Sequence, residues 1–356
     1  MVSAGAAAGD LAALPKAHLH LHFTGSLSVP TLQSLAQDRG IDLPDQLVDS
    51  VALDVPADKR GWFRFQRLYD IARAAVTGED ALRTVVSSAA AEDAAEGSRR
   101  LELQVDPTSY APSVGGLQPA LEIILDEAKV ASAATGVQVG VIVAASRVRH
   151  PFDARTLARL AARYAGQGPG QVCAFGLNNN EWEGETSEWD GAFRIARRAG
   201  LPGVPHGGEL RGPEHLAEVV DHLLPTRIGH GVRAVEDADL LARLVDAGIT
   251  FEVCPASNVR LGVYPTLADV PLTTLLDAGV RVALGADDPL LFLSRLVDQY
   301  RTARDVHGLT DAELAGLARA SIEASFAPDT DKARWLSEVD DWLVGAQPRA
   351  ASMRCR

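Results

Sequence analysis

Short apolar runs rich in β-branched residues recur along the chain and alternate with longer segments of helical period. Eight such runs occupy residues 18–23, 101–105, 137–144, 172–177, 203–206, 227–230, 250–254 and 280–285. Between them, apolar side chains recur at helical spacing, as in residues 153–164, where Leu157, Leu160 and Tyr164 fall on one face. Eight alternations of strand and helix predict an α/β fold in which parallel strands close into a (β/α)8 TIM barrel.

Two of the predicted helices carry start signals. Asp153 can cap the helix over residues 153–164, because its carboxylate can accept from the free N–H groups of the first turn. Thr310 and Glu313 have the spacing of a capping box, which predicts a helix over residues 310–324.

The interval between the first two strands is longer than one helix requires. Residues 28–100 hold at least two further predicted helices and the aromatic run GWFRFQRLY at residues 61–69. Such a helical insertion after strand 1 either forms a lid or substrate wall above the barrel or packs its aromatic side chains as core, and the two readings are compatible. We expect one domain over residues 11–346, with flexible segments at 1–10 and 347–356.

Composition excludes several classes of partner. The chain has 34 Lys and Arg against 47 Asp and Glu, and the net charge of −13 repels nucleic acid and anionic membrane surfaces. We found no signal peptide and no apolar run of about 18 residues, so we expect a cytoplasmic protein. The three cysteines lack CysxxCys spacing, which argues against a thiolate zinc site. The oligomeric state stays open.

The segment KAHLHLHFTG at residues 16–25 places His18, His20 and His22 on alternate positions. Alternate side chains of a strand project from one face, so these imidazoles are predicted to lie together. Grouped neutral imidazoles are typical of half a transition-metal site, although histidines without metal are an equal alternative on this segment alone.

Polar motifs follow three later strands at the point where each strand ends. HGGE at residues 206–209 follows the fifth strand, GHG at 229–231 the sixth, and GADDP at 285–289 the eighth. Because a barrel of this kind collects its catalytic groups at the carboxyl ends of the strands, these side chains are predicted to meet the histidines at one rim.

Five motifs together resemble the adenosine deaminase family of the metal-dependent amidohydrolase superfamily. They are KAHLHLHFTGSL, PHGGE, RIGHGV, FEVCPASN and GADDPLLF, in that order from about residue 16 to 325. The resemblance implies a TIM barrel, one Zn²⁺ per chain, and hydrolysis of a 6-aminopurine nucleoside, a small-molecule substrate, to the 6-oxopurine nucleoside and ammonia.

Carried over by motif, the resemblance assigns four metal ligands and three further catalytic residues. Three imidazoles and one carboxylate suit zinc, although iron, cobalt or manganese can occupy such sites. A bound ion of this kind lowers the pKa of water from about 15.7 to about 7. The ligands are His20, His22, His206 and Asp287. His230 would deprotonate the water, a protonated Glu209 would donate to purine N1, and Asp288 would anchor N7. His18 is interpreted as packing or support for the ligands.

Two departures from the family pattern bear on the substrate. Thr24 stands where adenosine deaminases commonly carry an acidic residue for the ribose 5′-hydroxyl, which favours a 5′-modified nucleoside. In FGLNNNE at residues 175–181, Asn179 stands near a glycine whose backbone contacts N3 in the family, so its amide is a candidate contact.

The runs GWFRFQRLY, QVDPTSYAP and SRVRH resemble the branch associated with 6-amino-6-deoxyfutalosine deamination in menaquinone biosynthesis. That resemblance implies aromatic residues around the benzoate of the substrate, namely Trp62, Phe63 and Phe65. It also implies an arginine for the carboxylate, with Arg64, Arg67 and Arg147 as candidates.

Three alternatives remain. Adenosine itself is the simplest alternative substrate. A binuclear metal hydrolase is less favoured, because the fourth predicted strand ends in GLNNNE without the bridging lysine of such enzymes. A catalytically silent zinc-binding protein on the same fold is disfavoured by Glu209 and His230, since neither is needed merely to hold zinc.

Overall fold

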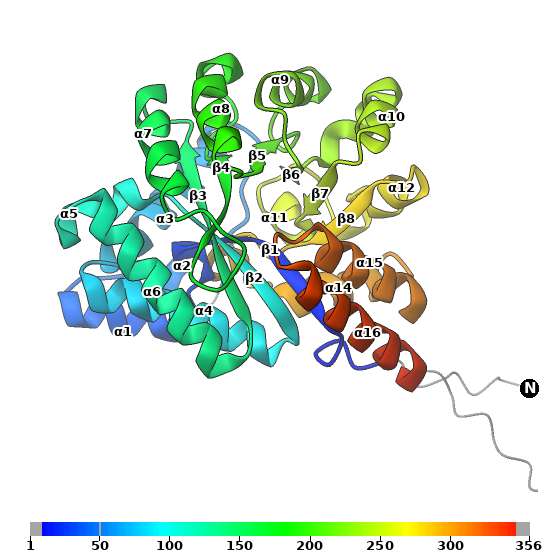
Figure 1. Ribbon diagram of the computed structural model, residues 1–356, viewed down its shortest axis with the longest axis horizontal. Coiled ribbons are helices and arrows are strands. Elements are labelled where there is room, and N and C mark those ends of the chain that lie inside the picture. The colour runs from blue at the N-terminus through cyan, green and yellow to red at the C-terminus, as the bar shows by residue number, and fades with distance from the viewer. Residues whose placement is uncertain (1–8, 50, 347–356) are drawn as a thin grey trace, which may run out of the picture.

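The computed structural model describes residues 9–49 and 51–346, which form one parallel barrel (Figure 1). The eight strands pair in sequence order. Their bounds are β1 Lys16–His22, β2 Ser98–Val105, β3 Gln138–Ser146, β4 Val172–Asn178, β5 Gly203–Gly207, β6 Arg227–His230, β7 Thr250–Val253 and β8 Arg281–Leu284. The barrel closes where the Asp287 N–H donates to His20 O over 3.0 Å and the His22 N–H donates to Asp287 O over 3.0 Å. The predicted α/β barrel is therefore confirmed.

Helices surround the strands, as Figure 1 shows. The helices that follow the insertion after β1 are α4 Glu79–Ala95, α5 Ala111–Val114, α6 Leu117–Thr135, α7 Pro151–Ala162, α8 Asp190–Arg198, α9 Pro213–Leu223, α10 Ala238–Asp246, α11 Pro255–Arg260, α12 Leu272–Asp277, α13 Pro289–Phe292, α14 Leu296–Asp305, α15 Asp311–Ala324 and α16 Asp329–Ala346. The short α11 lies at the rim of the barrel, where Ser257 and Asn258 contact Asp287 and Glu209. Single 3-10 turns are η1 Thr24–Ser26, η2 Pro107–Ser109, η3 Thr186–Trp189, η4 Val232–Glu236 and η5 Leu267–Asp269. Within the described residues, no helix is both long and apolar enough to cross a bilayer.

The insertion after β1 contributes three extra helices before α4. They are α1 Val29–Arg39, α2 Asp45–Val48 and α3 Lys59–Ala75. Phe65 of α3 is buried and stacks on Phe292 with ring centroids 5.8 Å apart, so the insertion shares the core of the barrel. Other α3 side chains line the cavity described below, so the two readings of the insertion hold together.

The two predicted helix starts have different outcomes. Thr310 Oγ1 accepts from the Glu313 N–H over 3.3 Å, and Glu313 Oε2 accepts from the Thr310 N–H over 2.7 Å, which confirms the capping box of α15. Asp153 does not cap α7, because the helix already begins at Pro151. His150 is the cap, and its Nδ1 accepts from the Phe152 N–H over 3.2 Å. Proline fits the first turn because it has no N–H to satisfy there.

A bulge in β1 interrupts the alternation of side-chain directions along the strand, so that His18 faces away from His20 and His22. The register of β1 against β2 shifts between His18 and Leu21. His18 Nδ1 lies 2.9 Å from Asp93 Oδ1 on the outer helix α4, while its Nε2 accepts from the Ala286 N–H over 3.1 Å. The expectation that all three histidines share a face is therefore wrong, whereas the supporting role of His18 agrees with these contacts.

The terminal segments expected to be flexible, 1–10 and 347–356, lie outside the described residues except for Gly9 and Asp10. The Gly9 N–H donates to Asp311 Oδ2 over 2.8 Å, so this residue is tied to the start of α15.

Candidate active site

The four predicted metal ligands converge at the carboxyl end of the barrel. The ring centroids of His20 and His22 are 5.2 Å apart, those of His20 and His206 are 4.8 Å apart, and those of His22 and His206 are 5.1 Å apart. Asp287 Oδ1 lies 3.1 Å from His22 Nε2 and 3.6 Å from His20 Nε2. Potential ligand atoms of His20, His22 and His206 all lie within 4.8 Å of one another. Segments from opposite sides of the barrel thus bring one set of donor atoms to a point.

Three residues of the rim adopt backbone conformations that are unusual for residues other than glycine. The φ angles are 77° at Asn179, 66° at His230 and 63° at Asp287. Asn179 directly follows β4, His230 ends β6, and Asp287 lies in the loop after β8. Such left-handed conformations persist only where the surroundings impose them, and they gather at functional sites. Here the turns place side chains over the mouth of the barrel.

The donor set fits a divalent cation of the zinc type. His20 Nε2 and His206 Nε2 are buried and have no hydrogen-bond partner among the described residues. Burial and the neighbouring imidazoles hold the pKa of His206 well below its usual value, so its ring is neutral and can ligate. Burial alone would lower the pKa of His20, yet the carboxylates of Asp287 and Glu252 outweigh it and raise that pKa to about 10. The site therefore attracts positive charge.

Glu209 and His230 lie beside this cluster in complementary protonation states. Glu209 Oε1 lies 3.4 Å from His230 Nδ1 and accepts from Asn258 Nδ2 over 3.3 Å. Burial, together with the charge of Asp287, raises the pKa of Glu209 well above its usual value, which favours the protonated form that can donate. Burial lowers the pKa of His230 to about 3, so its ring is neutral and can accept a proton. The opposite directions of these two pKa shifts are the arrangement expected of an acid and base pair.

Asp288 lies at the edge of the ligand cluster, with a carboxylate oxygen within 4.8 Å of potential ligand atoms of His22 and Asp287, so the expectation that it faces elsewhere is not confirmed. Its carboxyl group is buried, and Oδ1 has no hydrogen-bond partner in the described part of the chain. Burial and the adjacent Asp287 raise the pKa of Asp288 well above its usual value. Asp288 also lines the cavity, so its carboxyl group is accessible to a bound molecule.

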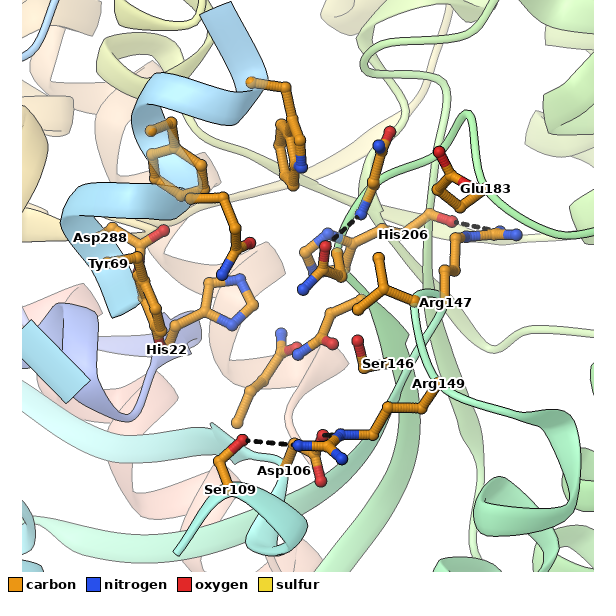
Figure 2. A pocket seen from close by; sticks show the side chains of 18 of the residues that line it. His22, Tyr69, Asp106, Ser109, Ser146, Arg147, Arg149, Glu183, His206 and Asp288 are labelled. Atoms are coloured by element: carbon orange, nitrogen blue, oxygen red, sulfur yellow. Dashed lines mark hydrogen bonds and ion pairs between the residues drawn. The ribbon is translucent and has the colours of Figure 1, made fainter. Parts of the chain in front are cut away.

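A cavity of about 820 Å³ opens above these groups. Figure 2 shows His22 and His206 directed toward its centre and Asp288 on one side. Helix α3 forms one wall with Trp62, Phe63 and Tyr69. At the edge, Arg149 joins the ends of β2 and β3, since its Nε lies 3.2 Å from Asp106 Oδ2 and its Nη2 donates to Ser109 Oγ over 3.3 Å.

The predicted substrate contacts divide into those that line the cavity and those that do not. Among the described residues that line it are Trp62, Phe63, Phe65, Arg147 and Asn179. Arg147 is buried, lies over the Trp189 ring at 5.4 Å, and donates to His206 O over 3.5 Å. Its Nε and Nη1 atoms have no partner in the described structure.

Three other predicted contacts lie elsewhere. Arg64 and Arg67 are exposed on α3 and are not among the described residues that line the cavity. The two arginines sit on the solvent face of the helix, because the opposite face carries Phe65 into the core. Thr24 is fully buried and its Oγ1 lies 2.7 Å from the Tyr110 hydroxyl oxygen, so it acts behind the cavity wall.

The sequence reading missed several residues that support the site. Glu252 Oε2 lies 2.8 Å from His20 Nδ1, and Ser257 Oγ donates to Asp287 Oδ2 over 2.5 Å. Asn258 contacts Glu209, as described above. All three belong to the FEVCPASN motif, and Glu252 faces inward because it alternates with the outward Phe251 and Val253. The alternation of apolar and acidic positions in this motif is the sequence signal that could have identified Glu252.

Comparison with known proteins agrees with this geometry. Residues 15–342 match the sequence model of the family described as adenosine deaminase. A Streptomyces virginiae protein provisionally named adenosine/adenine deaminase is 56% identical over 339 residues, which span 95% of this chain and 99% of the relative. The chain belongs to the adenosine deaminase family.

Further relatives are named for a free purine base. An adenine deaminase of Agrobacterium fabrum is 34% identical over 92% of this chain and 98% of its own length. The crystal structure of adenine deaminase from Arthrobacter aurescens superposes with a TM-score of 0.84 at 30% identity, covering 93% of this chain and 100% of that one. This member of the adenosine deaminase family is therefore a hydrolytic deaminase that acts on C–N bonds of purines, in a family of metal-dependent enzymes.

Proposed function

We propose that the protein deaminates a 6-aminopurine by zinc-dependent hydrolysis, releasing ammonia and leaving the 6-oxopurine. The observation that carries the proposal is the convergence of His20, His22, His206 and Asp287 beside Glu209 and His230. Burial raises the pKa of Glu209 and lowers that of His230, which supports an acid and a base at these two positions. The four ligand residues would hold one Zn²⁺. When bound, such a cation makes hydroxide available at neutral pH.

The chain's own residues account for the remaining chemistry. Glu209 donates its proton to purine N1, which draws electrons from the ring and makes C6 open to attack. His230 takes the proton released from the attacking water. Asp288 donates to N7 and fixes the orientation of the base. A new C6–O bond forms, and His230 passes its proton to the amino group, so that the C6–N bond breaks and ammonia leaves. The C6 hydroxyl proton returns to the Glu209 carboxylate, which gives the 6-oxopurine and restores both side chains.

The size of the cavity favours a substrate larger than a free base. A purine base fills only a small part of about 820 Å³, and α3 extends the wall away from the ligand cluster. A 5′-extended nucleoside such as 6-amino-6-deoxyfutalosine would place its arene against Trp62 and Phe63. Arg147 is the one predicted arginine in the described cavity lining, and its free N–H groups suit a carboxylate.

Thr24 supports this substrate less directly than its sequence position suggests. Because its hydroxyl is paired with Tyr110, it does not offer a contact to the 5′ side. It does leave that wall without the carboxylate that would require a free 5′-hydroxyl.

Adenine and adenosine form the second candidate pair. The names of the Streptomyces, Agrobacterium and Arthrobacter relatives favour them, since those proteins are called adenosine/adenine or adenine deaminases. Deamination of adenine or adenosine would use the same residues, with Glu209 as the acid, His230 as the proton acceptor and the same four metal ligands.

A substrate panel separates the candidates. Zinc-loaded protein is assayed for loss of 6-aminopurine absorbance with adenine, adenosine, 5′-deoxyadenosine, methylthioadenosine and 6-amino-6-deoxyfutalosine. We expect the highest kcat/KM with the last compound, and a large preference for adenine or adenosine would refute the extended substrate. Glu209→Gln should retain zinc and lose turnover, because an amide cannot deliver the proton to N1. No turnover with any compound would overturn deamination itself.

A further inference from the structure

A second buried glutamate lies directly behind the acid-bearing turn. Glu181 ends the NNNE segment after β4, where the left-handed backbone at Asn179 redirects the chain toward β5. Only 1% of Glu181 is exposed. Its Oε1 accepts from the Glu209 N–H over 3.3 Å, and its Oε2 accepts from the N–H groups of Leu210 and Arg211 over 2.9 and 2.8 Å. One carboxylate thus receives three successive backbone donors.

These bonds complete the anchoring of the turn that joins His206 to Glu209. The carbonyl oxygens of Gly207 and Gly208 accept from the N–H groups of Gly231 and Arg233, each over 3.0 Å. The segment that follows β6 therefore holds the carbonyl side of the turn. Among the hydrogen bonds of the described residues, the N–H groups of 209–211 donate to Glu181. A buried N–H group without an acceptor is costly, so the turn depends on this carboxylate.

The two glycines explain why such an anchor is needed. Gly208 has a φ of +70°, and a Cβ at Gly207 would lie 3.2 Å from both Leu216 and Val219. Close packing and backbone reversal thus require residues without side chains just before Glu209. Glycines also leave the backbone with more freedom than other residues, so hydrogen bonds must fix it. A fan of adjacent N–H groups is a binding site for acceptor oxygens, and the Glu181 carboxyl group supplies them from within the chain.

We propose that Glu181 is the positioning residue for Glu209. By fixing residues 209–211, Glu181 holds the Glu209 carboxyl group within reach of purine N1. The chemical role of Glu209 rests on the proposed function, whereas the anchoring of residues 209–211 does not. A carboxylate offers two oxygens to three donors, but the amide of Glu181→Gln has one oxygen and would direct an NH₂ group at a backbone N–H. The turn would then lose at least one bond and shift.

Amide hydrogen exchange tests the anchor without any substrate. In the zinc-loaded wild-type protein, the amides of 209–211 should be protected, and in Glu181→Gln they should exchange at least about tenfold faster. Glu185→Gln is the matched control, since Glu185 is an exposed glutamate four residues further along the same segment. Unchanged exchange in Glu181→Gln, or equal acceleration in Glu185→Gln, would overturn the proposal. If Glu181→Gln does not fold, Glu181→Asp keeps the charge on a shorter arm and should show intermediate protection.

Kinetics tests whether the anchor serves Glu209. Glu181→Gln should retain its zinc and lower kcat by about 10²-fold with a much smaller change in KM, because a displaced acid acts in the transition state. In a Glu209→Gln background the same change should have little further effect on the residual rate. If Glu181→Gln lowered kcat by the same factor in the wild-type and the Glu209→Gln backgrounds, the positioning role would be overturned. If the wild type deaminates nothing, the proposed function fails while the exchange result still decides the anchor.

Discussion

Gly25 lies against the carboxyl group of Asp288 so closely that no side chain fits between them. A Cβ on Gly25 would stand 1.7 Å from Asp288 Oδ1 and 2.6 Å from its Cγ. The φ angle of Gly25 is not in the left-handed region, so space alone requires glycine at this position. The glycine of the first motif therefore serves an aspartate of the last one, 263 residues later in the chain (288 − 25).

Gly25→Ala should consequently displace Asp288 and weaken the hold on purine N7. We expect kcat/KM to fall by about tenfold or more and the free energy of unfolding by about 1–3 kcal/mol, as for other overpacked sites. Steady-state kinetics and denaturant unfolding measure the two effects. Gly316→Ala is the control, because Gly316 lies within α15 with open space around it, and alanine there should be neutral or slightly stabilising. Equal behaviour of the two variants would contradict the steric account.

The barrel and the rim position of the candidate ligands could be predicted from the sequence because both follow from the periodic strand pattern, whereas the ligand roles came from the family resemblance. Apolar runs mark strands, and polar residues directly after them must lie at one rim. His20, His206 and Asp287 could therefore be placed before any coordinates were known. The bulge in β1 could not, since it changes the facing of His18 without a local sequence signal.

Residues outside this periodic rule were harder to place. The exposure of Arg64 and Arg67 depends on which face of α3 meets the barrel. Aromatic residues occur on several faces of this helix, so the sequence alone does not show which face is buried. The partner of Thr24 comes from the distant Tyr110. Glu181 acts through the backbone of another loop, a kind of contact that residue types alone do not reveal.

Glu252 connects His20, a proposed metal ligand, to a charged network inside the barrel. Its Oε1 accepts from Arg227 Nε over 2.6 Å, and Arg227 Nη2 in turn donates to Glu102 Oε2 over 2.7 Å. All three side chains are almost fully buried. The carboxylate therefore has a fixed position from which to hold Nδ1–H of His20 and leave Nε2 free for a metal.

Glu252→Gln should lower zinc affinity by about 10- to 100-fold, because the amide is a weaker acceptor for the His20 N–H. Competition with a chromophoric chelator measures the affinity, and Glu214→Gln, a change at an exposed glutamate of α9, is the control. Zinc affinity equal to that of the wild type would show that Glu252 has no part in orienting His20.

Removal of the metal should lower both activity and stability. The donor cluster gathers Asp287 and three imidazoles in a buried space, and a cation that binds only the folded chain stabilises it by mass action, about 2.7 kcal/mol at 100 times its Kd. We expect chelator-treated protein to be inactive and to unfold several degrees lower. Zinc should restore both properties, whereas magnesium should not, because it prefers oxygen ligands. Full activity after verified metal removal would refute the metal site.

Glu96, at the end of α4, predicts a pH dependence of stability that is independent of the active site. Burial, together with the nearby Asp93, raises its pKa from 4.5 to about 7, although the Val297 N–H donates to its Oε2 over 3.2 Å. The folded chain therefore binds more protons than the unfolded chain between these two pH values, so the contribution of Glu96 to stability is full below about pH 4.5 and is lost as the pH rises through 7.

Glu96→Gln removes this titration while keeping the shape of the side chain. Relative to the wild type, the variant should gain about 1–2 kcal/mol of unfolding free energy between pH 4.5 and 8, a figure reduced from the full pKa shift because Glu96 is partly exposed. Denaturant unfolding of both proteins at pH 5, 6, 7 and 8 gives the difference directly. A constant difference across this range would mean that Glu96 titrates normally in the folded protein.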